Sequence, residues 1–448
     1  MNTLNSALVR LLLLAVAVFL LTASRSAADE LRRRGMLGVR LVPAPTGAGV
    51  EQAMPDTPAA KAGLRPGDVI IKVNGDDVSE LPQFMSMMRK FYGGDTIKLT
   101  VKRGDETIET DLTLAPRPKE TSENHEVIYD SCSVGDQRAR TLVTRPEGDG
   151  RLPAVLMLPS PLPQSSELPP QMARHPFALT IDGFSSAGIV TMRVDRFGVG
   201  DSDGGDPQAT PFDTDVALYR SAAKRLSQYE FVDPTRVYVF SQGLGSALVP
   251  LVAAEPAVRG VISYGSTAVR PWTTGMVEMH RRVWDLETVK ADEIDKRAKE
   301  LEKFLAACAK PGANPRTLLN DYPALVPIAD NLAPREDMML GIPLHYFRSI
   351  ATTDLLSAWA RLDLPVLSLW GEADFQANEA DAKAVVTAVN KAHDSRATYK
   401  SLPEVDHGSF QADDQEDSYL SGYQGGEYND VVVQTIIRWI RAQRPKAA

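Results

Sequence analysis

The pattern of apolar and polar residues changes along the chain and divides it into two parts. Within residues 35–116, apolar positions alternate with polar ones, most clearly over 96–101 and 107–114. Such alternation is typical of antiparallel strands that bury one face of a sheet. From residue 125 onward, short apolar runs are instead separated by longer helical stretches. The pattern therefore predicts a small strand-rich α+β domain followed by a larger domain of the α/β class.

In the second part, strands and helices alternate. The predicted strands cover residues 154–158, 189–194, 237–240, 260–264 and 366–370. The predicted helices cover residues 173–187, 213–228, 245–254 and 378–392. Strands separated by helices form βαβ units, which predicts a doubly wound, mostly parallel sheet. The long insert over about 266–362 is rich in Glu, Lys, Arg and Leu, which predicts a helical cap.

The composition excludes several classes of function. The chain has 448 residues, 43% of them apolar and 24% charged, which is typical of a globular protein with more than one domain. Its net charge of −9 argues against a nucleic-acid-binding face, which would be basic. The cysteine and histidine residues show no metal-ligand spacing. We therefore expect no nucleic-acid partner, no metal and no cofactor.

The first 28 residues have the features of a secretory signal peptide. Arg10 supplies a positive charge, residues 11–23 are mostly apolar, and Ser26-Ala27-Ala28 offers small residues for cleavage. The apolar stretch is well short of the ~20 residues that a membrane-spanning helix needs. We expect export to the periplasm or the extracellular space. The alternative is an uncleaved N-terminal anchor, which would hold the protein at a membrane.

Only two cysteines, Cys132 and Cys308, follow this segment. In an oxidising compartment they could pair, but a disulfide requires Cα atoms within ~7 Å of each other. The sequence does not give that distance. A disulfide and two separately buried thiols both remain open.

Residues 35–116 contain the motifs of a peptide-binding module. The segment Gly35-Met36-Leu37-Gly38-Val39 is followed by the run P-A-A-K-A-G-L-R-P-G-D-V-I over 58–70. An Asn-Gly pair at 74–75 then forms a predicted hairpin turn. Together these motifs resemble a PDZ domain, specifically the bacterial type attached to HtrA-type serine proteases.

This resemblance implies a groove for peptide or protein C-termini. The N–H groups of a Gly-rich loop can bind a terminal carboxylate, and an extended peptide can add as a strand to the free edge of residues 39–42. A helix over 81–89 would wall the pocket for the last side chain, although some of its apolar residues must serve the core. The implied peptide-binding residues are Met36, Leu37, Gly38, Val39, Phe84 and Met88. Residues 117–124 are polar and contain proline, which predicts a linker.

Four motifs follow one another within residues 125–445. They are an R-x-D stretch with several glycines, a strand–turn–helix segment, a strand ending in G-x-x-D, and a late loop ending in D-H-G, over 193–204, 232–246, 364–374 and 402–408. Their order resembles the α/β-hydrolase superfamily, nearest to its bacterial esterase and serine-aminopeptidase-like branches. The resemblance implies Asp374 as the triad acid and His407 as the general base.

The nucleophile is missing from its expected position. The family's G-x-S-x-G turn places Ser241 at the first Gly, Gly243 at the Ser and Gly245 at the last Gly. Glycine has no side chain that could act as a nucleophile, and it adopts the strained positive φ of this turn at little cost. A second departure is the segment 159–163, in which three prolines remove N–H donors where an oxyanion hole is expected.

These features favour one function and leave two alternatives. We expect an exported protein whose PDZ domain captures peptide C-termini and whose hydrolase-fold domain is a catalytically degenerate pocket, for instance for a small ester or amide, or a partner surface. The first alternative is an active esterase or peptidase that uses Ser241 as a displaced nucleophile with Asp374 and His407. The second is a non-hydrolytic enzyme that uses the His407–Asp374 pair as acid and base.

Overall fold

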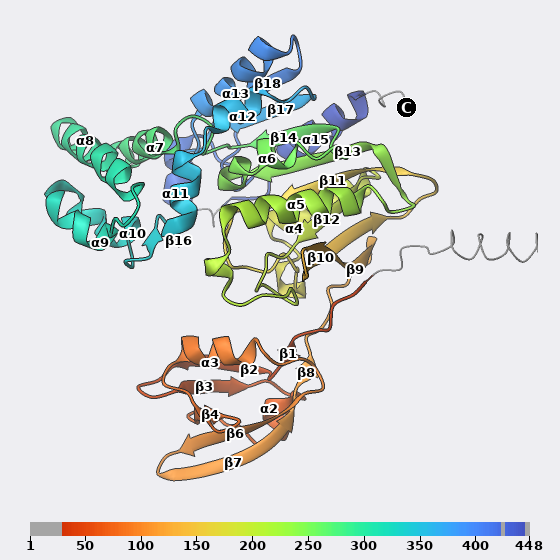
Figure 1. Ribbon diagram of the computed structural model, residues 1–448, viewed down its shortest axis with the longest axis vertical. Helices are drawn as coiled ribbons and strands as arrows, with labels where there is room; N and C mark the ends of the chain where they lie inside the picture. The colour runs from red at the N-terminus through yellow and green to blue at the C-terminus, as the bar shows by residue number, and fades with distance from the viewer. Residues whose placement is uncertain (1–28, 423–425, 444–448) are drawn as a thin grey trace, which may run out of the picture.

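The chain folds into two domains that are joined by a pair of adjacent segments (Figure 1). The computed structural model describes residues 29–422 and 426–443, so the predicted signal segment lies outside the described residues. Strand β1 (Gly35–Met36) enters the small domain and pairs antiparallel with β8 (Ala115–Pro116), which leaves it. Both ends of the small domain are therefore attached to the large domain at the same place.

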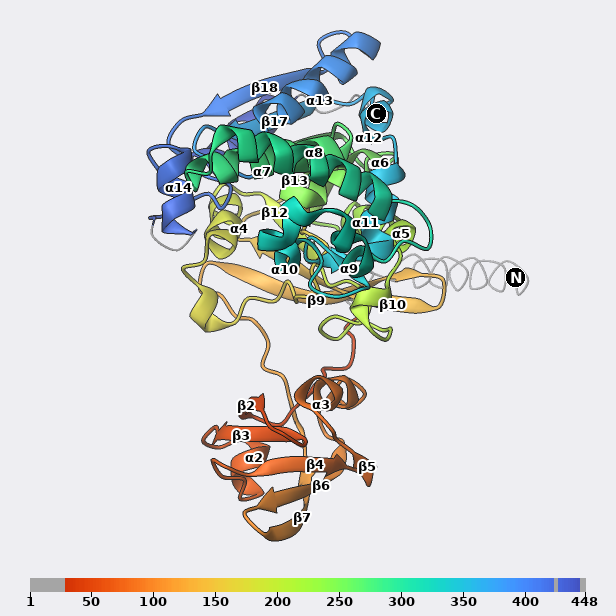
Figure 2. The ribbon, with the colours of Figure 1, turned by 90° about the vertical axis from the view of Figure 1, so that its left-hand side faces the viewer.

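The small domain is an antiparallel sheet with two short helices. Its strand order is β2-β3-β4-β6-β7, and β5 pairs with β4. The strands are β2 (Val39–Pro43), β3 (Ala48–Ala53), β4 (Val69–Val73), β5 (Asp76–Asp77), β6 (Thr96–Arg103) and β7 (Glu106–Thr113), and the helices are α2 (Pro58–Lys61) and α3 (Leu81–Met88). Positive φ angles at Asn74 and Gly75 form the predicted hairpin turn between β4 and β5. Figures 1 and 2 show α3 on the side of this domain that faces the large domain.

The large domain is built on an eight-stranded sheet of order β18-β17-β14-β13-β11-β12-β10-β9. The strands are β9 (His125–Val134), β10 (Gln137–Pro146), β11 (Leu152–Leu158), β12 (Val190–Val194), β13 (Val232–Gln242), β14 (Gly260–Tyr264), β17 (Val366–Gly371) and β18 (Ala397–Leu402). All pairings from β12 to β18 are parallel, and β9 and β10 extend one edge antiparallel. The predicted α/β class with a mostly parallel sheet is confirmed.

Helices cover both faces of this sheet and complete two apolar cores. Helices α4 (Pro176–Ser186) and α15 (Val431–Ala442) bury one face, where Phe184 and Ile436 are fully enclosed. The other face is covered by α5 (Phe212–Leu226), α6 (Val249–Val252), α12 (Leu355–Ala360) and α13 (Glu379–Ala392). The chain order of the strands reverses direction around β11, so ligands are expected beyond the carboxyl ends of the neighbouring strands.

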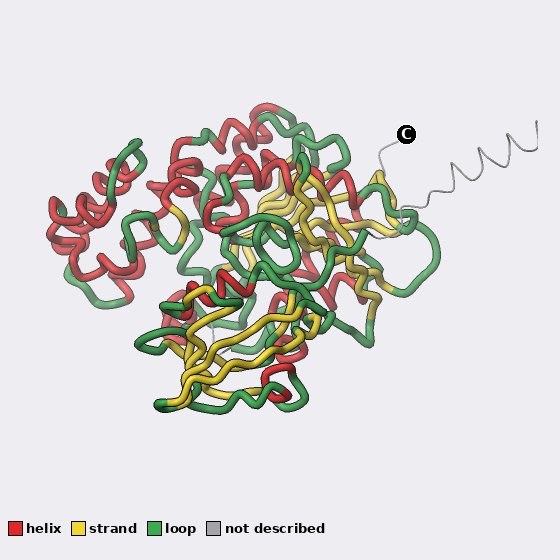
Figure 3. The backbone as a smooth tube through the Cα atoms, turned by 60° about the horizontal axis from the view of Figure 1, so that its bottom comes forward, coloured by secondary structure: helices red, strands yellow, loops and turns green. Residues whose placement is uncertain are grey.

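Between β14 and β17 the chain forms mainly helices. Besides α12, which covers the sheet, these are α7 (Trp272–Leu286), α8 (Ala291–Cys308), α9 (Pro315–Leu318), α10 (Ala329–Leu332) and α11 (Leu344–Thr352), with a small hairpin of β15 (Met338–Met339) and β16 (Ile342–Pro343). Figure 3 shows this helical group set apart from the strands of both sheets. Helix α14 (Gln415–Ser421) lies beside α7.

The two cysteines lie in different elements and are not bonded to each other. Cys132 is buried in β9, and Cys308 is buried at the end of α8. Of the two possibilities that the sequence left open, the structure contains separate thiols.

Candidate active site

The turn after β13 keeps the backbone of a nucleophile elbow without the side chain. Gly243 begins a short 3-10 helix (Gly243–Ala247) directly after the strand, and its φ is +59°, in the left-handed region. A Cβ atom on Gly243 would stand 2.8 Å from Nε2 of His407, closer than Cβ atoms approach their neighbours in real proteins. The imidazole therefore occupies part of the space that a side chain at this position would need.

Asp374 and His407 form the hydrogen-bonded pair that the sequence predicted. Oδ2 of Asp374 lies 2.8 Å from Nδ1 of His407. The other oxygen, Oδ1, accepts hydrogen bonds from the amides of Gln376 and Ala377, both at 2.8 Å. Asp374 is fully buried, while the side chain of His407 keeps 17% of its surface exposed. The fully bonded carboxylate fixes the orientation of the ring.

The electrostatics around the pair raise the pKa of the His407 imidazole. Burial lowers the pKa of His407, but the charge of Asp374 and the hydrogen bond that its carboxylate accepts from the ring outweigh burial, so the pKa of His407 is raised. A neighbouring carboxylate stabilises the charged form of a histidine in this way.

Gly265 is a part of this site that the sequence did not reveal. It directly follows β14 and has a φ of +55°. A Cβ atom there would lie 2.8 Å from Oδ2 of Asp374 and 2.9 Å from Nδ1 of His407. Only glycine leaves room for the pair at the carboxyl end of β14. The one sequence signal was a Gly immediately after an apolar strand.

Two polar side chains hold the loop that carries His407. Gln242 donates a hydrogen bond to the carbonyl oxygen of His407, and Tyr264 donates one to the carbonyl oxygen of Asp406. The buried carboxylate of Asp406 accepts the amide of Phe410 at 2.8 Å. Because these donors come from β13 and β14, the position of His407 is set by the same strands that carry Gly243 and Gly265.

Ser241 is engaged with the backbone of the neighbouring strand. Its side chain is buried, and Oγ donates a hydrogen bond of 3.1 Å to the carbonyl oxygen of Leu158 in β11. Ser246, in the following turn, donates to the carbonyl of Gly243 at 2.6 Å. The structure thus brings Gly243, Asp374 and His407 together and places the Ser241 hydroxyl on a main-chain acceptor.

The proline-rich segment after β11 presents carbonyl oxygens to the elbow. A Cβ atom on Gly245 would lie 2.8 Å from the carbonyl oxygens of both Leu158 and Pro159. The proline nitrogens at 159, 161 and 163 carry no hydrogen. The segment therefore lacks three of the donors that an oxyanion hole could use.

Helix α7 is fixed to the loop that carries Asp374. Arg282 donates to the carbonyl oxygen of Phe375 at 2.7 Å and to Oδ1 of Asn378 at 2.9 Å. Arg270, near the start of α7, bonds to the buried Asp381 at 2.8 Å. The helical insert is therefore attached directly to the loop that carries Asp374.

The small domain has an open sheet edge beside α3. Strand β2 ends the sheet, and Gly38 precedes it with a φ of +79°. Of the predicted groove residues, Leu37 and Phe84 are buried in the core of this domain, whereas Met36, Gly38, Val39 and Met88 are partly exposed. Val42 on β2 and Met85 on α3 are the more exposed apolar side chains, at 38% and 44%. Phe84 thus belongs to the core, and Met85 takes the exposed position on the helix.

Residues 29–422 and 426–443 contain neither a candidate metal site nor a candidate membrane-spanning helix. In these residues, no cluster of His, Cys, Asp and Glu could hold a metal ion, and no helix is long and apolar enough to cross a membrane.

A surface hollow of about 350 Å³ lies away from the elbow and is lined by Ser122, Glu123, His125, Glu126, Arg145, Pro146, Glu147 and Gly148.

Known proteins resemble the two domains separately. Residues 35–114 match the PDZ domain family. A probable periplasmic serine endoprotease, DegP-like, of Hahella chejuensis is 46% identical over 65 residues, which is 14% of this chain and 13% of that protein. Esterase EstD of Thermotoga maritima is 26% identical over 241 residues, which is 53% of this chain and 50% of the esterase. The solved structure of Est1E from Butyrivibrio proteoclasticus aligns with a TM-score of 0.41 and 12% identity, over 70% of this chain and 97% of that one.

The chain spans about half the length of the esterase and about an eighth of the protease. The family match and the sheet topology together show that the chain contains a PDZ domain followed by an α/β-hydrolase-fold domain, which is similar to esterases.

Proposed function

We propose that this protein is an exported binding protein in which a PDZ domain captures peptide or protein C-termini and the hydrolase-fold domain has lost serine-type catalysis. The observation that carries the proposal is Gly243, which stands at the elbow with His407 against it. Acyl transfer by this fold needs an oxygen at that position to attack the carbonyl. The segment 159–163 supports the same conclusion because its prolines cannot donate to an oxyanion.

The decisive experiment compares the wild type with Gly243→Ser, using a fluorophosphonate probe and a panel of small esters and peptides. The wild type should neither label nor turn over substrate. The Gly243→Ser variant should label once the His407 ring, whose Nε2 would lie 2.8 Å from the new Cβ, turns aside, because the serine oxygen then lies beside the base. Adding His407→Ala to that variant should abolish the labelling, since the base is then lost.

The same experiment can overturn the proposal. Robust hydrolysis by the wild type that is abolished by both Ser241→Ala and His407→Ala would establish an active enzyme with a displaced nucleophile. This outcome requires Ser241 to leave the carbonyl of Leu158, to which it is bonded at 3.1 Å. The matched control is Ser246→Ala, which removes a neighbouring hydroxyl that bonds to the carbonyl of Gly243.

The retained Asp374–His407 pair favours a second candidate, a non-hydrolytic enzyme that moves a proton at Nε2 of His407. The pair keeps a 2.8 Å hydrogen bond and a partly exposed ring. A ligand with an acidic hydroxyl or C–H group would be the substrate. Ligand turnover that is lost in His407→Gln but kept in Ser241→Ala would support this candidate over simple binding.

Peptide capture is supported by the open edge of β2 and the exposed apolar side chains of Val42 and Met85. A displayed library of random C-termini should yield ligands with an apolar last residue, and amidation of the terminal carboxylate should abolish their binding. Met85→Glu should weaken binding, whereas Ser86→Glu, its exposed neighbour on α3, serves as the control. Equal binding of the acid and amide forms would contradict carboxylate capture.

Export is proposed from the composition of residues 1–28 and from the likeness of the PDZ domain to a protein named as periplasmic. Sequencing the N-terminus of the protein secreted from its own cells tests it. A mature chain that begins after Ala28 supports cleavage, and an intact N-terminus in the membrane fraction would establish the anchor instead.

A further inference from the structure

The segment that leads into the PDZ domain is anchored in the hydrolase-fold domain by a buried arginine. The side chain of Arg33 is 8% exposed. Its guanidinium forms ion pairs with Asp201 and, at 2.7 Å, with Glu167. It also donates to the carbonyl oxygens of Arg117 at 3.1 Å and Pro118 at 2.7 Å, on the segment that leaves the PDZ domain. The side chain of Arg33, on the incoming segment, therefore binds both the outgoing segment and the large domain.

Both segments make further bonds at the same place. The amide of Arg34 donates to Oδ1 of Asp201 at 2.7 Å, and the amide of Arg117 donates to the carbonyl of Arg34 at 3.1 Å. Further along, the buried Glu120 receives two hydrogen bonds from the guanidinium of Arg193, at 2.8 and 2.9 Å. Within the predicted linker, residues 117 and 118 are thus held by the incoming segment, and the buried Glu120 is held by the large domain.

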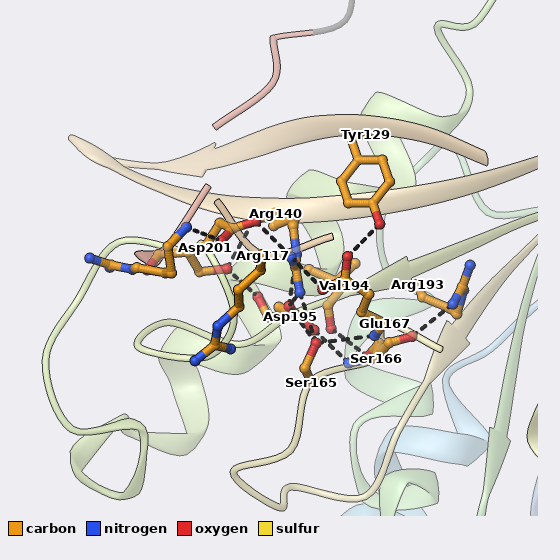
Figure 4. A network of polar contacts seen from close by, with 12 residues as sticks. Arg117, Tyr129, Arg140, Ser165, Ser166, Glu167, Arg193, Val194, Asp195 and Asp201 are labelled. Atoms are coloured by element: carbon orange, nitrogen blue, oxygen red, sulfur yellow. Dashed lines mark hydrogen bonds and ion pairs between the residues drawn. The ribbon is translucent and has the colours of Figure 1, made fainter. Parts of the chain in front are cut away.

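Arg140 lies at the centre of this arrangement (Figure 4). Its side chain is 2% exposed, and it forms ion pairs with Asp195, with Glu167 at 3.0 Å and with Asp201 at 2.6 Å. Glu167 and Asp201 each pair with both Arg140 and Arg33. Buried charges that compensate one another in this way resist rearrangement, because moving one leaves another unpaired.

The far side of the network is the loop over residues 159–168, which begins beside the elbow. Ser165 and the amide of Ser166 bond to Asp195 at 3.1 and 2.6 Å. The amide of Leu168 donates to Glu120 at 2.7 Å. At its other end, the loop starts from Leu158, whose carbonyl accepts Ser241. The loop therefore runs from the elbow to the residues that flank the PDZ domain.

We propose that these contacts form an interdomain clamp, made by Arg33, Arg34, Arg117 and Glu120 with Glu167, Arg193 and Asp201. The clamp fixes the orientation of the PDZ domain on the hydrolase-fold domain. It also couples that orientation to the loop over 159–168, so that a rotation of the PDZ domain displaces the loop beside the elbow. This inference does not depend on whether the elbow is catalytic.

The two-segment attachment gives the proposal its physical basis. A single polar linker would leave the two domains free to reorient. Here the two segments are paired through β1 and β8, the incoming segment is bonded to the buried carboxylate of Asp201, and the outgoing segment is bonded to the side chain of Arg33. Coupling of this kind is reciprocal, so a change at the loop also shifts the PDZ orientation.

The test measures the distance between spin labels placed on the full chain at Lys102→Cys in the PDZ domain and Gln137→Cys in the hydrolase-fold domain. Both native positions are exposed, whereas Cys132 and Cys308 are buried and stay unlabelled. The distance distribution should be narrow in the wild type. It should broaden at least twofold in Arg33→Ala.

Hydrogen exchange of the same proteins reports on the loop. The amides over 159–168 should exchange at least tenfold faster in Arg33→Ala, with the amides of β13 and β14 unchanged. The matched control is Arg32→Ala, because Arg32 is 58% exposed and bonds only within the PDZ domain, to Asp95 and the carbonyl of Gly93. It should change neither readout.

If Arg33→Ala does not fold, Arg33→Lys replaces it, since a lysine keeps the charge but cannot bond to all four partners at once. It should shift both readouts in the same direction by a smaller amount. An unchanged distance distribution would overturn the clamp, and an unchanged exchange rate over 159–168 would overturn its connection to the loop.

Discussion

Gly243→Ala is expected to destabilise the hydrolase-fold domain by two separable effects. The first is backbone strain, because alanine at a φ of +59° costs about 1–2 kcal/mol relative to glycine. The second is the contact with His407, whose Nε2 would lie 2.8 Å from the new Cβ. Moving the ring aside weakens its charge-assisted hydrogen bond to Asp374, and part of the ~1.5–3 kcal/mol that such a bond contributes is then lost.

Gly135→Ala supplies a matched control for the strain. Gly135 lies in the turn between β9 and β10 with a φ of +57°, and a Cβ there would meet nothing within 4 Å. The two substitutions therefore share the backbone effect and differ in the contact. We expect about 1–2 kcal/mol for Gly135→Ala and about 2–4 kcal/mol for Gly243→Ala.

Urea unfolding followed by tryptophan fluorescence measures both variants. All five tryptophans lie in the hydrolase-fold domain, so the signal reports on that domain alone. In a His407→Ala background the difference between Gly243→Ala and Gly135→Ala should disappear, because the contact is gone. Equal destabilisation by the two substitutions in the wild-type background would refute the close approach of His407.

Three further predictions concern ionisable groups. Asp374 raises the pKa of His407 against the effect of burial. The stabilisation by the pair is therefore complete below the unfolded histidine pKa of about 6.5 and is lost as pH rises through the folded pKa. The difference in unfolding free energy between wild type and His407→Gln should shrink as pH rises, and a constant difference would contradict this. Arg103→Ala should lower the unfolding temperature of the PDZ domain at neutral pH in calorimetry, because Arg103 holds the buried Asp68 through two 2.8 Å bonds. Arg103 lowers the pKa of Asp68, so this loss should fade as pH falls through the folded pKa, and persistence in acid would count against the pair. Burial raises the pKa of both cysteine thiols to about 12, so neither should react with a disulfide reagent near neutral pH until the protein is unfolded.

The sequence predicted the pairing of Asp374 with His407 because its signals are local. Asp374 and His407 each follow a strand within a few residues, and parallel strands bring such positions to one edge of the sheet. Gly243 was recognisable for the same reason, since strand, turn and helix are contiguous. Gly265 carried no comparable signal, because its role depends on packing against two residues that are over 100 positions away.

The fate of Ser241 could not be decided from the sequence either. Its hydroxyl is bonded to Leu158, a residue 83 positions earlier in the chain, through the register of β11 and β13. Likewise, the apolar residues of the helix over 81–89 could not be divided between core and groove until α3 was placed on its sheet. The structure buries Phe84 and exposes Met85.

The linker shows most clearly what the sequence predicts and what only the tertiary contacts decide. Polarity and proline in residues 117–124 indicated a connection between domains, and the two domains themselves followed from hydrophobic periodicity and from motifs, which are properties of neighbouring residues. That the connection is a buried clamp depends on Arg33 meeting Glu167 and Asp201, more than 130 residues away. Sequence alone predicted which elements form and placed Gly243 at the elbow between β13 and the turn that follows it. Tertiary structure decided which distant charges and backbone groups meet, because desolvated ion pairs and close packing exist only once the chain has folded.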